Sequence, residues 1–67
     1  MTRETIAKLP EAAQKEIDLL RNAYKTNDAY HDREITRARA AGYTSGLQDA
    51  GIITDMERRV LYIYVTL

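Results

Sequence analysis

The 67-residue sequence has no cysteine and only one histidine, so it lacks the two usual staples of a very small domain. A chain of this length buries only about 60% of the surface that its unfolded form exposes, which leaves a monomer marginally stable. Disulfides and zinc clusters both need residues that are missing here. Close helix packing or oligomerisation remains as the source of stability, and we expect no cofactor and no metal site.

An excess of charge of either sign is also missing, because ten basic residues balance ten acidic ones. Long-range attraction to nucleic acid or to anionic lipid is weak in such a chain. No apolar run approaches the ~18–20 residues that span a bilayer, and the opening residues M-T-R-E-T-I-A-K-L-P contain no apolar signal-peptide core. We therefore expect a cytoplasmic protein that does not contact a membrane.

Turn-forming residues are few, with three glycines and one proline, while 30% of the residues are charged and 45% are hydrophobic. This composition favours a folded helical chain over a disordered one. We predict one all-α domain over residues 1–67, a small bundle of about three helices with a short N-terminal arm. The predicted boundaries are an arm over 1–9 and helices over about 10–25, 28–50 and 55–66.

The strongest periodic pattern lies in the first third of the chain. Apolar residues recur there at steps of three and four, which places them on one side of an α-helix. They are Ile6, Leu9, Ala13, Ile17, Leu20 and Tyr24. Pro10 fits the first position of the helix, where its missing N–H costs nothing.

The second predicted helix has an unusual stripe of small residues. The stripe consists of Ile35, Ala38, Gly42, Ser45 and Gly46. Two glycines inside a helix cost about 0.5–1 kcal/mol each relative to alanine. Either the helix breaks near Gly42, or the small stripe lets another helix approach closely, and we favour close approach.

The C-terminal segment carries clear helix signals at its start. Gly51 fits the position just past a helix end, and Thr54 and Glu57 have the spacing of a capping box. The final residues R-V-L-Y-I-Y-V-T-L also alternate in the manner of a β-strand. A lone strand leaves its backbone groups unpaired unless another chain pairs with it, so we favour a helix.

This last helix is apolar on all sides between residues 60 and 65, and such a helix is normally buried on several sides. A core side composed of Met56, Val60, Ile63 and Leu67 would suffice for the domain itself. Further apolar side chains would then be shared with a partner. The predicted partner contacts are Tyr43, Leu61, Tyr62, Tyr64 and Leu67.

One local cluster of positive charge provides a secondary polar surface. It consists of Arg33, Arg37 and Arg39. Glu34 lies three residues before Arg37, so an exposed, self-compensated face is the simpler interpretation. The alternative is an acidic or phosphate-bearing partner.

Candidate chemistry is sparse. His31 lies near Asp28, Asp32 and Glu34, but a metal site would need a second ligand cluster. With one serine, one histidine and no cysteine, nucleophile and base pairs are nearly exhausted, and we expect no catalytic residue and no enzymatic activity.

A helix-turn-helix interpretation of residues 42–59 gives a DNA-binding alternative, with Arg58 and Arg59 opening the recognition helix. Beyond Arg59 that helix is mostly apolar, whereas helices that read a DNA groove expose polar side chains. We therefore regard nucleic acid as a possible partner that the sequence does not favour.

The second half of the chain contains G-Y-x-x-G-L-x-D-A-G-I-I-T-x-x-E-R and ends in L-Y-x-Y-x-T-L. This pattern resembles small uncharacterised helical proteins of bacterial phages and other mobile elements. Such families include regulators and inhibitors of host machinery, anti-CRISPR proteins among them. The resemblance implies a small regulator or inhibitor and assigns a role to no individual residue.

Together these features predict a non-enzymatic protein–protein interaction module. Its partner is either a larger host protein or a second copy of the chain in a structural homo-oligomer.

Overall fold

The computed structural model describes residues 2–26 and 30–67, the side chains of Tyr30 and His31 excepted, and its secondary structure is entirely helical. The helices in this described part are α1 (Thr2–Ala7), α2 (Glu11–Thr26), α3 (Tyr30–Asp49) and α4 (Asp55–Thr66). The predicted all-α class is confirmed. The segment predicted as an arm contains α1, and the C-terminal segment is a helix rather than a strand.

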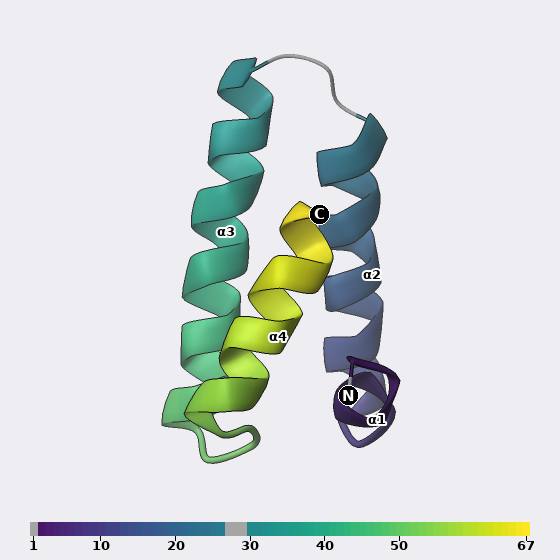
Figure 1. Cartoon of the computed structure of the whole chain (residues 1–67), viewed down its shortest axis with the longest axis vertical. Coiled ribbons are helices and arrows are strands. Elements are labelled where there is room, and N and C mark those ends of the chain that lie inside the picture. Colours follow the sequence, from purple (N-terminus) through teal and green to yellow (C-terminus); the bar gives the residue numbers. More distant parts are fainter. Residues whose placement is uncertain (1, 27–29) are drawn as a thin grey trace.

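The helix α4 occupies the central position of the fold. Figure 1 shows α2 and α3 side by side and α4 lying across both, with α1 near one end of the pair. Contacts join α4 to each of the other three helices. Within the described part of the chain, no helix is both long and apolar enough to cross a membrane.

The helix α2 contributes the predicted apolar side. Ala13, Ile17, Leu20 and Tyr24 are all buried, and Ile17 is completely covered. Leu9, just before the helix, is buried as well, and Ile6 is partly buried against the same core. The periodic pattern of the sequence therefore identifies the inward side of α2 correctly.

The helix α3 is rotated away from the predicted orientation. The stripe of small residues faces outward, and a Cβ atom added at Gly42 or Gly46 would meet nothing within 4 Å. Neither predicted alternative holds within the chain, because the helix is continuous through Gly42 and no other helix approaches either glycine.

The buried side of α3 consists of Thr36, Ala40, Thr44 and Leu47. Two threonines can lie there because each hydroxyl donates to a carbonyl one turn earlier in its own helix. The Thr44 Oγ1 atom lies 2.8 Å from the Ala40 carbonyl oxygen, and Thr36 Oγ1 lies 3.1 Å from that of Asp32. No buried polar side-chain atom in the described residues lacks a partner.

The turn between α3 and α4 is closed by Gly51, as predicted. Its φ of 77° is the left-handed conformation that glycine adopts without a Cβ clash. The amide of Gly51 donates to Gln48 O at 2.9 Å, and that of Ile52 donates to Leu47 O at 3.0 Å. These two bonds form a Schellman motif, which satisfies the last carbonyls of α3.

The inward side of α4 differs from the predicted one. Leu61 and Val65 have no exposed surface, whereas Met56, Ile63 and Leu67 are 56%, 57% and 78% exposed. The predicted core side is therefore wrong. Because residues 60–65 are apolar all round, their pattern fits two opposite orientations, and contacts with other helices decide between them.

The glycines give a direct test of the α3 orientation. Gly42→Ala and Gly46→Ala should each raise the free energy of unfolding by about 0.5–1 kcal/mol, because both sites are helical, open and free of positive φ. Gly51→Ala should lower it by about 1 kcal/mol through left-handed strain. Urea unfolding measures all three, and destabilisation by Gly42→Ala would contradict this orientation.

A second pair of variants tests the α4 orientation. Leu61→Ala leaves a cavity in the core and should lower the free energy of unfolding by about 2–5 kcal/mol. Ile63→Ala removes a similar side chain from the exposed side and should change it by less than about 0.5 kcal/mol. Equal losses in thermal or urea unfolding of the two variants would reject the assignment of inward and outward sides.

Candidate functional site

The outward side of α4 carries a row of apolar side chains, which we name the outer α4 stripe. It consists of Met56, Val60 and Ile63 of α4 together with Leu67, the residue that follows the helix as its C-cap. Three of these are among the large hydrophobic residues that the structure exposes, and Val60 is partly exposed. Single exposed apolar residues are ordinary in proteins, but four along one helix edge form a continuous apolar surface.

This stripe lies on the same helix as the centre of the core. Leu61 and Val65 fill the interior on the opposite side of α4. A helix that is apolar on two sides is normally covered on both, and α1, α2 and α3 cover only the inward one. Among the described residues, the outer α4 stripe is therefore the apolar surface that most clearly lacks a neighbour within the chain.

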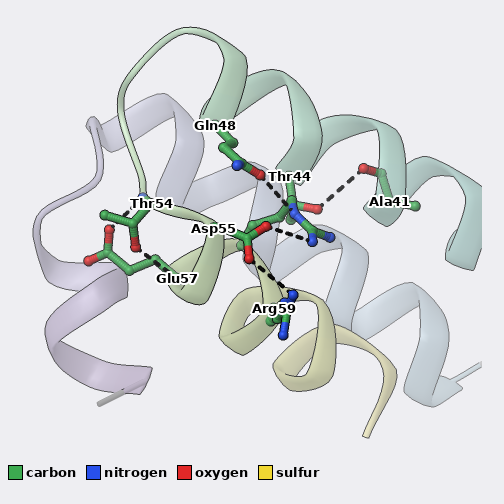
Figure 2. Close-up of polar contacts among 8 residues, drawn as sticks. Ala41, Thr44, Gln48, Thr54, Asp55, Glu57 and Arg59 are labelled. Carbon is green, nitrogen blue, oxygen red and sulfur yellow. Dashed lines mark hydrogen bonds and ion pairs between the residues drawn. The ribbon is translucent and has the colours of Figure 1, made fainter.

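The start of α4 is held by a capping box. Thr54 N–H donates to Glu57 Oε1 at 2.8 Å, and Glu57 N–H donates to Thr54 Oγ1 at 3.2 Å (Figure 2). Lys8, which follows α1, forms an ion pair with the same Glu57 carboxylate. The predicted cap is confirmed, and the carboxylate also ties α4 to the N-terminal segment.

A second polar link crosses from α4 to α3. The Arg58 Nε–H donates to Gln48 Oε1 at 2.8 Å, and its guanidinium lies 3.1 Å from Asp55 Oδ1. Arg59 binds the other oxygen of Asp55 at 3.2 Å (Figure 2). With Glu57 reaching the N-terminal segment and Arg58 reaching α3, the rotation of α4 about its axis is fixed, and the outer α4 stripe faces away from both.

The three predicted contact tyrosines are partly buried at the edge of the core. Arg21 of α2 lies over the Tyr64 ring, 4.2 Å from its centre, and also donates to the Tyr64 carbonyl oxygen. Burial raises the pKa of the Tyr43 phenol, and the charge of Glu16 adds to this effect. Tyr43, Tyr62 and Tyr64 thus contribute to the domain's own packing and leave part of each side chain exposed.

The remaining two predicted contacts have opposite positions. Leu67 is the most exposed large apolar residue of the described chain, whereas Leu61 is completely buried. Leu61 was placed at the surface by the same orientation error that placed Ile63 inside. Leu61 therefore stabilises the fold and offers nothing to a partner, which is a correction to the predicted contact set.

The arginine cluster of α3 is largely engaged within the chain. Arg37 forms an ion pair with Glu34 and donates to the Tyr24 phenol oxygen at 3.0 Å, and the phenol contact is the main reason that the pKa of Arg37 is raised. Arg33 lies 5.4 Å from the centre of the Tyr24 ring. Only Arg39 projects as an exposed side chain. These contacts match the self-compensated interpretation of the cluster.

The geometry gives little support to the two alternatives, DNA binding by α4 and a metal site. Arg58 and Arg59 share the carboxylate of Asp55, and the outward side of their helix is apolar where a groove-reading helix would be polar. Among the described residues, no group of three or more metal-ligating side chains comes together. Asp28 and the side chain of His31 lie outside the described residues.

Sequence reasoning missed Met56 and Ile63 as surface residues, because the contacts that mark the inward side of α4 join it to other segments of the chain. Glu57 and Arg58 occupy the side of α4 that includes Leu61, where Glu57 forms an ion pair with Lys8 and Arg58 donates to Gln48. The polar contacts of Glu57 and Arg58 with other segments therefore identify the inward edge of α4, together with the buried Leu61.

Comparison with known proteins adds no assignment, because no protein-family model, curated protein or solved structure matches this chain.

The contacts at the start of α4 predict an acid-sensitive fold. The hydrogen bond from Lys8, then that from Thr54, holds the pKa of Glu57 below its ordinary value of 4.5. Arg58 is the main cause that lowers the pKa of Asp55 below 3.8. A carboxylate with a lowered pKa stabilises the fold above its unfolded pKa, and this stabilisation is lost as pH falls through the folded pKa.

We therefore expect the carboxylates of Asp55 and Glu57 to contribute a constant amount to the free energy of unfolding at neutral pH. This free energy should decline below about pH 4.5. Glu57→Gln retains an oxygen that can accept from Thr54 but removes the charge, so it should flatten part of this decline. Urea unfolding across the acid range checks the slope, and an unchanged slope in the variant would contradict the role of Glu57.

Proposed function

We propose that the chain is a non-enzymatic protein–protein interaction module whose contact surface is the outer α4 stripe. The observation that carries the proposal is that one helix is apolar on two opposite sides, with Leu61 and Val65 in the core and Ile63 and Leu67 in solvent. Burial of apolar surface is the main driving force of most protein association.

The free energy available from apolar burial indicates how much surface a partner has to cover. Complete burial of a large aliphatic side chain contributes about 1.5–3 kcal/mol, so covering the exposed half of Met56 or Ile63 contributes about 1 kcal/mol. The whole stripe supplies about 3–4 kcal/mol, while association costs at least about 4 kcal/mol in lost rigid-body freedom. The interface must therefore extend beyond the stripe.

The neighbouring surface suits such an extension. Tyr62 and Tyr64 of α4 are partly exposed, and Arg59 of the same helix has an exposed side chain. Tyrosine and arginine are enriched in interfaces because each combines a large contact area with hydrogen-bond donors. The proposed contact surface is the stripe at the centre, extended by the exposed parts of neighbouring side chains such as Tyr64 and Arg59.

The role that we propose for this module is that of a small regulator or inhibitor, which is what the resemblance of residues 39–67 to small phage and mobile-element proteins implies. A regulator or inhibitor of this size acts by occupying a surface of a larger protein. The outer α4 stripe is the part of this chain that would make that contact.

Two variants with matched chemistry test the proposal. Ile63→Asp places a charge in the stripe, whereas Leu19→Asp places one on α2 at a similarly exposed apolar residue, 57% against 62% exposed. Proteins captured by the tagged wild-type chain from its native cells are identified, purified and recombined with each variant. We expect Ile63→Asp to weaken binding at least tenfold and Leu19→Asp to leave it unchanged.

Circular dichroism and thermal unfolding of both variants establish that the fold is intact. Equal loss of binding in the two variants, or binding that survives Ile63→Asp, would place the contact surface elsewhere on the chain and contradict the proposal.

A further inference from the structure

The C-terminal end of α4 carries two residues of the outer α4 stripe, Ile63 in the last turn and Leu67 as the C-cap. The last four carbonyl groups of an α-helix have no hydrogen-bond donor within the helix, and they form the negative end of its dipole. No basic residue lies in the last turn of α4 to balance that end. Its stabilisation has to come from water or from another part of the chain.

The polar side chains of the last turn leave the Tyr64 carbonyl group available. Thr66 donates its hydroxyl hydrogen to the Tyr62 carbonyl oxygen, at 2.9 Å, one turn earlier in the helix. Tyr64 is the third residue from the end of α4, so its carbonyl oxygen is one of those without a donor in the helix. This oxygen accepts a hydrogen bond from the guanidinium of Arg21.

Arg21 holds Tyr64 in two ways, although the two residues are 43 positions apart. The guanidinium donates to the backbone oxygen, and it also lies over the phenol ring, 4.2 Å from the ring centre. A hydrogen bond from a charged donor is stronger than one between neutral groups. A cation is also attracted by an aromatic face and by the C-terminal end of a helix. One side chain of α2 thus supplies the cap that α4 lacks.

The position of Arg21 in α2 fixes its side chain for this contact. Arg21 is half-buried and lies one turn from Ile17 and Tyr24, which are both buried. Its partial removal from water strengthens its electrostatic contacts. Arg37 and Arg58 each bind a carboxylate, whereas both polar contacts that the structure gives Arg21 are with Tyr64.

We propose that Arg21 is a positioning residue for the contact surface: it caps α4 from α2 and so keeps Ile63 and Leu67 ordered in the free chain. The capping box at Thr54 fixes the start of the same helix, and Arg21 fixes its end. Because Arg21 acts through α4, it need not touch the partner itself. The capping is independent of what the chain binds, whereas its importance for binding rests on the proposed function.

Three variants test the cap. Arg21→Met removes the charge and the donors and keeps an unbranched side chain that can still cover the Tyr64 ring. Arg21→Lys keeps the charge and a donor but lacks the flat guanidinium. Lys15→Met removes an equal charge from an exposed position of the same helix and serves as the control. Circular dichroism establishes that all three retain the helical fold.

Amide hydrogen exchange, followed by NMR, compares the last turn of α4 with the middle of the same helix. In Arg21→Met we expect the amides of residues 65–67 to exchange about tenfold faster, because loss of a hydrogen bond from a charged donor shifts the opening equilibrium by about that factor. The amides of residues 59–62 should change less. A purely global loss of stability would instead accelerate the middle of the helix, whose amides exchange through unfolding of the core.

The other two variants sharpen this comparison. Exchange of residues 65–67 in Arg21→Lys should fall between the wild-type chain and Arg21→Met, and Lys15→Met should exchange like the wild-type chain. Unchanged exchange of these residues in Arg21→Met would overturn the role of Arg21 as a cap. Acceleration in Arg21→Lys equal to that in Arg21→Met would overturn it as well, because charge and donor would then contribute nothing.

Binding to the protein captured by the wild-type chain tests the effect on the contact surface. We expect Arg21→Met to raise the dissociation constant about threefold, because only the ordered fraction of the chain is ready to bind, and Lys15→Met to leave it unchanged. If Arg21→Met binds as tightly as the wild-type chain while Ile63→Asp does not bind, the positioning role is overturned and the proposed function stands. If Ile63→Asp binds normally, the proposed function and the positioning role both fail, and the exchange rates still decide the cap.

Discussion

The burial of Leu61 and Val65 is the contact on which the rest of the molecule depends. Both side chains are completely covered, and they project from α4, which packs against each of the other three described helices. The inward side of α4 closes the core between α2 and α3 and also holds the N-terminal helix. Seven further apolar residues complete the same core cluster, and they come from α2, α3 and the segments beside them. Because a chain of 67 residues forms only a small core, loss of the α4 contacts would weaken the whole domain.

That dependence has a consequence for the opposite side of the same helix. The turn at Gly51, the capping box at Thr54 and the link from Arg58 to α3 hold α4 in one rotation. In this rotation Leu61 and Val65 face the core, and Ile63 and Leu67 face outward. A partner that bound the outward side of α4 would meet a helix whose backbone is already held by the core, so its binding would cost little backbone freedom.

Local signals predicted much of this fold from the sequence. The glycine stop, the capping box and the apolar side of α2 each depend on residues within a few positions of one another. The rotations of α3 and α4 could not be predicted in the same way. Residues 60–65 are apolar on every side, and Thr44 enters the core because its own helix satisfies its hydroxyl. The ion pair between Lys8 and Glu57 joins positions 49 residues apart, and no local pattern contains it. The same limit explains the candidate site. The sequence predicts Leu61 and Leu67 as surface contacts and Ile63 as a core residue, whereas the structure exposes Ile63 and Leu67 and buries Leu61.

The most direct test of the central claim is the solvent accessibility of these two neighbouring positions in α4. Methyl NMR spectra of a dilute sample, recorded with and without a soluble paramagnetic agent, report how closely solvent approaches each methyl group. We expect strong broadening of the Ile63 methyl signals and none of the Leu61 methyl signals. Broadening of Leu61 equal to that of Ile63, or a protected Ile63 beside an exposed Leu61, would contradict this expectation.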